Sequence, residues 1–396
     1  MFRVLIIAGL LLGAAPGCGG SEKPVKTAKQ KDKQEKRQET RALLGDARES
    51  ASAGEVDAAD QAYEQAYEAS KDFDILEEHV EFLIRAGRAP RAEEVLRPYY
   101  EENAIDIKGK KLYADALLAA EKGPEALKVA DEILDLDAED PAGYEKKGRA
   151  LILMEKTNDG LDLLRRAVQI DGTSATYHIE LGLALFTAKK VNEAALAFRA
   201  AVKNAPDDAK AHVYLGMALR EQDELKEAKQ VLLKAIELDG NDGRAYFELG
   251  LLYNRDRKQA DAEQALSKAV QKSPSQSLYW YAYGEIYRLQ QRTDEAISAY
   301  RKAIDLEPPY PKALTKLGVL LAERKEWDEA EKLLITGLRK EPRNPTNYLA
   351  LGDLYAAKRK PKDAVFYYEQ YLELAPKNDP ERSRVRDDVR DLKRRR

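Results

Sequence analysis

ATYHIELGLALFTAKKVNEAALAFRAAVKNAPDD (residues 175–208) is followed without a break by AKAHVYLGMALREQDELKEAKQVLLKAIELDGND (residues 209–242). When the two stretches are aligned, the pair Leu-Gly falls at 181–182 and at 215–216, and small residues coincide in both halves. Each stretch has 34 residues, which is enough for two short helices and their turns. This region is therefore one helical unit, repeated.

The same 34-residue interval runs through most of the chain. Glycine recurs at Gly148, Gly182, Gly216, Gly250, Gly284, Gly318 and Gly352. Alanine recurs at Ala194, Ala228, Ala262, Ala296, Ala330 and Ala364, and again at Ala167, Ala201, Ala235, Ala269 and Ala303. Prolines follow in the same register at Pro206, Pro274, Pro308, Pro342 and Pro376. Several interleaved series with one period exclude coincidence.

Each series has a physical interpretation. A glycine inside a helix costs about 1 kcal/mol relative to alanine, so we expect the backbone of a neighbouring helix to approach closely at each periodic glycine. Proline lacks an amide donor and clashes with the preceding turn, so the prolines should end the second helix of each unit.

The pattern resembles the tetratricopeptide repeat. This resemblance implies an all-α, right-handed solenoid of about ten helical hairpins. We expect seven regular units in residues 141–378, degenerate units in residues 39–140, and a C-terminal capping helix with a basic tail in residues 379–396. Val385, Val389 and Leu392 would cover the last unit, because an open-ended solenoid requires a polar cap.

The N-terminus predicts export. Arg3 precedes an apolar run from Val4 to Ala15 that is too short to span a membrane and is typical of a signal peptide at residues 1–17. The small residues before Cys18 resemble a bacterial lipobox, although Ala15 stands where that family usually has leucine. The resemblance implies acylation of Cys18, the only cysteine. The alternative is an ordinary secretory signal with an incidental cysteine.

If Cys18 is acylated, the lipid holds the protein on a membrane, and the Gly19 that follows favours the outer membrane, facing the periplasm, over the inner membrane. A secreted periplasmic protein is the remaining alternative. Residues 18–38 carry almost no core-forming side chains, so we expect a disordered basic tether there. Its lysines would serve as a solvated spacer or contact anionic lipid headgroups.

Charge is unevenly distributed along the chain. Residues 19–41 contain eight basic and four acidic residues, and residues 379–396 contain eight and five. With these segments and Arg3 removed from totals of 66 basic and 70 acidic residues, residues 42–378 retain 49 and 61, a net charge of -12. A body this acidic disfavours nucleic-acid binding.

Ligands of tetratricopeptide repeats usually lie in a concave groove lined by the first helix of each unit. In the central units the groove places hold apolar residues, and arginines are expected at the rim. A patch of this kind suits a peptide or amphipathic helix with acidic residues; the alternative is packing between helices, or coverage by another part of the chain. The predicted partner-binding residues are Ile179, Leu183, Phe186, Val213, Met217, Arg220, Arg244, Phe247, Leu251, Arg255, Tyr281 and Arg288.

Signs of catalysis are missing from the sequence. No Gly-rich phosphate loop, GxSxG motif or HExxH motif is present, and there are three histidines, at His79, His178 and His212. We expect His178 and His212 to stack on neighbouring repeats, since they lack the partners of a zinc site. The sequence thus predicts no enzyme activity, cofactor, metal or small-molecule substrate.

Together these features predict a membrane-anchored scaffold that binds a protein partner to assemble or position an envelope machine. The resemblance to pilotin-like lipoproteins suggests type IV pili, secretins or motility complexes. Two alternatives are an adaptor that recruits peptidoglycan enzymes and a structural spacer without a single client.

Overall fold

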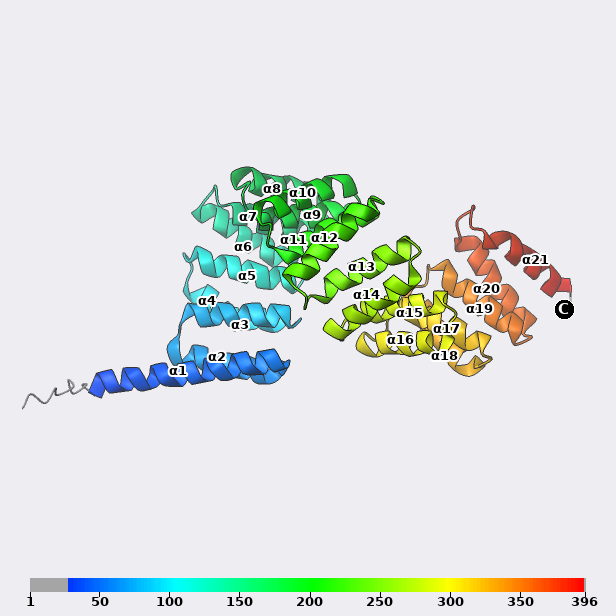
Figure 1. The fold of residues 1–396 in the computed structure, drawn as a ribbon, viewed down its shortest axis with the longest axis horizontal. Helices are drawn as coiled ribbons and strands as arrows, with labels where there is room; N and C mark the ends of the chain where they lie inside the picture. Colours follow the sequence, from blue (N-terminus) through cyan, green and yellow to red (C-terminus); the bar gives the residue numbers. More distant parts are fainter. Residues whose placement is uncertain (1–27, 395–396) are drawn as a thin grey trace, which may run out of the picture. The chain divides into compact units, whose positions relative to one another are not determined.

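Figure 1 shows the fold in a computed structural model that describes residues 28–394. All regular elements in this range are α-helices, 21 in number. They form two compact units, one ending at Leu136 and the other beginning at Asp137. The predicted signal peptide and Cys18 lie outside the described residues.

The helices form consecutive helical hairpins. Within each of the two compact units, every helix packs against the next one in the chain. From Phe73 onward, the first helices begin at intervals of 34 residues, and so do the second helices from Ala89 onward. The first helices are α1 (Ala28–Ala53), α3 (Phe73–Arg85), α5 (Ile107–Ala119), α7 (Pro141–Leu153), α9 (Ala175–Thr187), α11 (Ala209–Glu221), α13 (Gly243–Arg255), α15 (Ser277–Leu289), α17 (Pro311–Glu323) and α19 (Pro345–Ala357).

The second helices are α2 (Val56–Ser70), α4 (Ala89–Glu102), α6 (Gly123–Leu136), α8 (Thr157–Ile170), α10 (Val191–Asn204), α12 (Leu225–Leu238), α14 (Gln259–Lys272), α16 (Thr293–Leu306), α18 (Trp327–Lys340) and α20 (Pro361–Leu374). A final helix, α21 (Glu381–Arg394), follows the last hairpin. The prediction of an all-α solenoid of helical hairpins with a C-terminal capping helix is confirmed.

Side-chain caps start most of the first helices. Asp140 accepts hydrogen bonds from the backbone N–H groups of Ala142 at 2.8 Å and Gly143 at 3.2 Å. Such a cap satisfies amide donors that have no partner in the first turn and contributes about 1 kcal/mol. The capping residues are Asp72, Asp106, Asp140, Ser174, Asp208, Asp242 and Asn344.

Most of the periodic glycines make room for a side chain. A methyl group added at Gly182 would lie 2.4 Å from the ring of Phe198, and one added at Gly352 would lie 2.3 Å from the ring of Tyr368. Among the seven periodic glycines, a backbone atom lies nearest only at Gly148, where the Gly160 oxygen is 2.8 Å from the added methyl. At the other six the nearest atom belongs to a large side chain of the second helix, and a backbone atom is also within 3.4 Å of the added methyl at Gly250 and Gly318. The expected backbone approach is therefore not the main reason for these six glycines. The side chains opposite them are Phe198, Leu232, Leu266, Tyr300, Leu334 and Tyr368.

Every hairpin turn from α3 onward contains one residue in the left-handed region. Gly87 takes this conformation in the turn between α3 and α4, with φ of +74°. In the later turns a residue other than glycine takes this conformation, at a steric cost of about 1–2 kcal/mol per residue. These residues are Glu121, Glu155, Lys189, Asp223, Arg257, Gln291, Lys325 and Arg359. These conformations could not be predicted from the sequence, because the polar side chains at these positions indicate only exposed turns.

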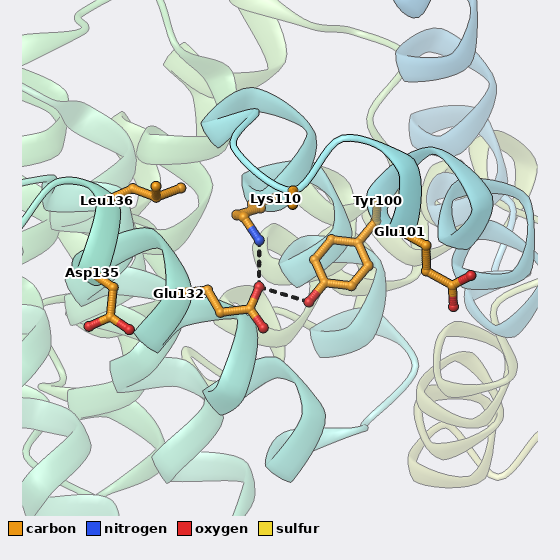
Figure 2. A pocket seen from close by; sticks show the side chains of 7 residues that line it. Tyr100, Glu101, Lys110, Glu132, Asp135 and Leu136 are labelled. Atoms are coloured by element: carbon orange, nitrogen blue, oxygen red, sulfur yellow. Dashed lines mark hydrogen bonds and ion pairs between the residues drawn. The ribbon is translucent and has the colours of Figure 1, made fainter.

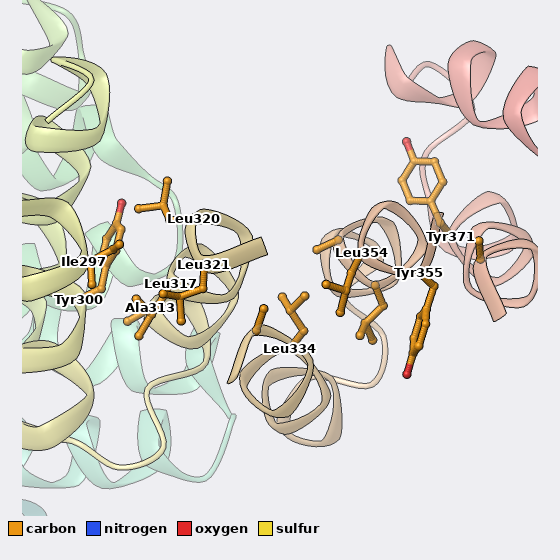
Figure 3. Packing of buried hydrophobic residues seen from close by; sticks show 14 of the residues in the cluster. Ile297, Tyr300, Ala313, Leu317, Leu320, Leu321, Leu334, Leu354, Tyr355 and Tyr371 are labelled. Atoms are coloured by element: carbon orange, nitrogen blue, oxygen red, sulfur yellow. The ribbon is translucent and has the colours of Figure 1, made fainter. Parts of the chain in front are cut away.

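The core of the C-terminal hairpins is a continuous cluster of aromatic and aliphatic side chains (Figure 3). Tyr300, Leu334 and Tyr371 are almost completely buried in it. Val385 of α21 has no exposed surface, and Val389 and Leu392 pack partly against the same cluster. The Arg382 guanidinium donates to the carbonyl oxygens of Leu372 and Ala375, each at 2.7 Å, so α21 closes the last hairpin.

The first helix departs from the sequence prediction. α1 begins at Ala28, so the last part of the expected tether, residues 28–38, is helical instead of disordered. Alanine, lysine, glutamine, glutamate and arginine are all strong helix formers, and they dominate this segment. The pairing of α1 with α2 provides the packed half from which the helix extends.

Candidate functional site

First helices of neighbouring hairpins lie side by side in the C-terminal unit. α9 packs against α11, α11 against α13, and α13 against α15. Residues at equivalent places, 34 positions apart in sequence, therefore form rows that cross several helices. Most of the predicted partner-binding residues fall on two such rows and their edges.

The first row is nearly buried. Ile179, Val213 and Phe247 are 9%, 3% and 7% exposed. Ile179 packs against Ala201 and Ala211, and the ring of Phe247 stacks on that of Tyr279 with centroids 4.5 Å apart. These side chains join one hairpin to the next, which is the packing alternative that the sequence left open. They present little surface to a partner.

The second row is half-exposed and apolar. Leu183, Met217 and Leu251 stand four residues after the first row, so they share its side of each helix. Their inner atoms contact the core clusters, while the rest of each side chain is accessible. Phe186, one turn after Leu183, is also half-buried. This row is the apolar surface that the central hairpins offer to a partner.

Tyr281 continues the groove toward the C-terminal hairpins. Its ring lies 5.9 Å from that of Tyr300 and 5.5 Å from that of Tyr310 between centroids. The hydroxyl group of Tyr300 donates to Glu285. Glu285 follows Leu251 in the second row, four residues after Tyr281, which continues the first row. At this end the apolar row gives way to an aromatic and carboxylate cluster.

The predicted basic rim is compensated by carboxylates. Arg220 pairs with Glu221 at 2.6 Å and with Glu248 at 3.1 Å. Arg244 pairs with Asp242 at 2.8 Å. The two other rim arginines are also paired: Arg255 with Asp223 at 2.9 Å, and Arg288 with Glu285 at 3.0 Å. The arginines that the sequence placed at the rim therefore each have a carboxylate partner, which the sequence analysis did not include.

The pKa values of two acidic partners, Glu248 and Glu285, are shifted in opposite directions. Burial raises the pKa of Glu248 above its ordinary value, and the nearby Arg220 only partly opposes this. Burial also acts to raise the pKa of Glu285, but hydrogen bonds from Arg288 and Tyr300 outweigh it, so this pKa is lowered. Among the rim carboxylates, the pKa of Glu248 is thus raised and that of Glu285 is lowered.

His178 and His212 serve the inter-hairpin loops. Their Nε2 atoms lie 3.0 Å and 2.8 Å from the carbonyl oxygens of Gly172 and Pro206, six residues upstream. In other hairpins Tyr144, Trp280 and Tyr348 donate to the corresponding carbonyls. The expected stacking on neighbouring repeats is replaced by this loop contact, since each side chain turns back along its own chain.

A pocket of about 420 Å³ lies between α4, α5 and α6 (Figure 2). Lys110 stands where other hairpins have the aromatic or histidine donor, and its Nζ atom lies 2.5 Å from Glu132 Oε2. Tyr100 donates to the same oxygen at 2.8 Å. Burial acts to raise the pKa of Glu132, but these two hydrogen bonds lower it. The inner polar groups satisfy one another, so we assign them a structural role.

Across residues 28–394, no group of three or more His, Cys, Asp or Glu side chains is arranged to hold a metal ion. No helix in the same range combines the length and apolar character that crossing a bilayer requires.

Comparisons with known proteins agree with this architecture. Residues 255–382 match the family described as Cytochrome c-type biogenesis protein H TPR domain. Residues 179–243 and 215–277 match the family described as Tetratricopeptide repeat. No curated protein matches the sequence.

Among solved structures, a chain in the APC/C hetero-tetramer Cut9-Hcn1 is similar, with 17% identity, a TM-score of 0.56, and coverage of 89% of this chain and 76% of that chain. Yeast Tom70 has 16% identity and a TM-score of 0.51, and the match covers 91% of this chain and 96% of Tom70. At these identities the likeness concerns the fold alone.

Proposed function

We propose that this chain, which matches tetratricopeptide-repeat families over residues 179–277 and 255–382, is anchored to a bacterial outer membrane and binds a protein partner in the periplasm. Acylated Cys18 would supply the anchor, since several acyl chains on one residue partition strongly into a bilayer. The hairpins would supply a rigid surface on which the partner is positioned.

The half-exposed row of Leu183, Met217 and Leu251 is the observation that carries the binding proposal. Three apolar side chains at one place on adjacent first helices form a stripe across the repeat. An amphipathic helix or an extended apolar peptide would bury such a stripe. The paired arginines at its edge would contribute orientation more than affinity, because their charges are already compensated.

The process we propose is the assembly or positioning of an envelope machine, such as a type IV pilus, a secretin or a motility complex. The family matched by residues 255–382 is named for cytochrome c-type biogenesis, and this name adds c-type cytochrome assembly to the processes that the scaffold would serve.

Acylation is tested by mass spectrometry of the protein purified from membranes. The expected product begins at Cys18 and carries the mass of its acyl chains, whereas Cys18→Ser leaves the membrane fraction. An unmodified cysteine in the wild-type protein would refute the anchor and leave the scaffold proposal standing.

Partner binding is tested with a photo-crosslinking amino acid in place of Met217, in the native envelope. We expect a discrete crosslinked partner, and no such product from the same amino acid at Gln264, an exposed position on the second helix α14. Leu183→Asp combined with Leu251→Asp should abolish the product while circular dichroism stays helical. Equal crosslinking from both positions, or capture unaffected by the double substitution, would contradict the assignment of the groove.

A further inference from the structure

A second pocket, of about 670 Å³, lies where the first half of α1 extends past the end of α2. Its walls come from α1, from the last turn of α2 and from the residue that caps α3. The lining residues are Lys36, Arg37, Thr40, Arg41, Leu44, Ala69, Ser70 and Asp72.

Positive charge dominates this pocket. Arg37 and Arg41 are exposed and four residues apart, so they stand on one side of α1. Neither guanidinium has an ion-pair partner among the described residues, whereas Arg48, farther along the same helix, is held by Glu78 at 2.6 Å. Lys36 adds a third cation at the pocket wall.

The one carboxylate among the lining residues already accepts a hydrogen bond within the fold. Asp72 accepts the backbone N–H of Asp74 at 3.1 Å as the cap of α3. Glu68, on the neighbouring turn of α2, pairs with Lys71 at 2.7 Å. The two arginines therefore line a pocket with Thr40 and Ser70, and within the part of the chain that the structure describes no carboxylate is paired with them.

This combination is suited to a phosphate group. Guanidinium groups bind phosphate oxygens through two parallel hydrogen bonds. The hydroxyl groups of Thr40 and Ser70 already donate to the carbonyl oxygens of Lys36 and Ala66, at 2.9 Å and 3.0 Å, so the two arginines are the groups that would bind the phosphate. Leu44 and Ala69 provide an apolar wall beside the charged groups, as a ligand with both a phosphate and a hydrocarbon portion requires.

The position of the pocket in the chain favours a lipid as the source of that phosphate. Ten residue steps separate Cys18 from Ala28, where α1 begins, and such a segment spans at most about 35 Å. Lys36 lies about 12 Å farther along the helix, at 1.5 Å per residue. An anchor at Cys18 would thus keep the pocket within reach of the headgroups.

We infer that this pocket binds the phosphate groups of anionic phospholipids, so that the start of α1 lies against the bilayer. The inference deepens the proposed membrane anchoring and rests on it for the choice of a lipid over free phosphate. It assigns a role to the basic segment that a simple spacer does not have.

The test uses the full-length chain with Cys18→Ser, which removes acylation from the measurement. Binding is measured to vesicles of phosphatidylglycerol and phosphatidylcholine, and to vesicles of phosphatidylcholine alone. The ratio of the two partition coefficients is the readout, because apolar contributions from the N-terminal run are common to both. Arg37→Gln combined with Arg41→Gln should lower this ratio about 30-fold, since each arginine near an anionic surface contributes about a fivefold factor.

The matched control is Arg339→Gln combined with Arg343→Gln, two exposed arginines with the same spacing in sequence, which should leave the ratio unchanged. Circular dichroism checks that each variant remains helical. An unchanged ratio in the α1 variant, or an equal loss in the control, would overturn the inference. Saturable binding of inorganic phosphate without a preference for phosphatidylglycerol vesicles would overturn the choice of lipid. Acylation of Cys18 is measured separately, so failure of the anchor and failure of the pocket give different results.

Discussion

The packing of the periodic glycines can be tested at Gly182. Replacing it with alanine adds a methyl group whose carbon would lie 2.4 Å from a ring carbon of Phe198. That separation is far below the usual contact distance of about 3.5–4.0 Å between carbon atoms, so the ring or one of the two helices must shift. The alternative explanation for this glycine, close approach of a backbone, predicts a clash that does not depend on Phe198.

Two opposing effects determine how much Gly182→Ala changes the free energy of unfolding. Overpacking of a well-filled core costs about 1–3 kcal/mol, while alanine gains about 1 kcal/mol over glycine in the interior of a helix. Gly182→Ala alone should therefore lower the free energy of unfolding by up to about 2 kcal/mol. In a Phe198→Ala background the clash disappears, and the same substitution should stabilise the protein by about 1 kcal/mol.

The assay is a double-mutant cycle by urea denaturation followed by circular dichroism. The expected coupling between the two positions is about 1–3 kcal/mol. Gly148→Ala with and without Leu164→Ala provides the contrast, because the carbonyl oxygen of Gly160 lies 2.8 Å from the added methyl and remains when the leucine is truncated. If Gly182→Ala is equally destabilising with and without Phe198, the side-chain explanation is refuted.

Three further predictions concern a turn, a buried histidine and a surface ion pair. Lys189→Gly should raise the free energy of unfolding by about 0.5–1 kcal/mol in urea denaturation, because the residue has φ of +63° and relief of the left-handed strain exceeds the entropic cost of glycine; a loss of stability would contradict this. Burial lowers the pKa of His79 despite its contact with Asp60. Below the ordinary pKa of about 6.5, the unfolded chain therefore binds a proton that the folded chain does not. The free energy of unfolding should fall from pH 7 to pH 5 more steeply than in His79→Gln, and parallel pH profiles would disprove this. Arg199→Ala, which breaks a half-exposed pair with Glu227, should cost less than about 1 kcal/mol at low salt and nothing measurable at 1 M salt, and a larger, salt-independent loss would show that packing dominates.

The repeated unit was predictable from the sequence because it depends on local geometry. Leu-Gly pairs, alanines and prolines return at 34-residue intervals, and each hairpin must bury the same faces of its two helices. Burial therefore selects the same residue types at the same places in every unit. The capping role of α21 followed in the same way from the spacing of Val385, Val389 and Leu392.

The candidate site was predicted only in outline. The sequence correctly indicated apolar residues on the first helices of the central hairpins, but it did not separate the nearly buried Ile179, Val213 and Phe247 from the half-exposed Leu183, Met217 and Leu251. That distinction depends on how far the next hairpin covers each place. One signal was available in the sequence, since alanines at Ala211 and Ala245 leave room for the first row to be enclosed.

Contacts between different helices could not be predicted from the sequence, for a general reason. Arg220 meets Glu248 across 28 positions of sequence, and Gly182 meets Phe198 across two different helices. Helical periodicity fixes which side of a helix a residue occupies, so the residue pattern alone established the hairpins, their length and their apolar faces. Which side chain fills which space is set by the distance and angle at which hairpins pack, and that long-range geometry was decided only when the chain folded.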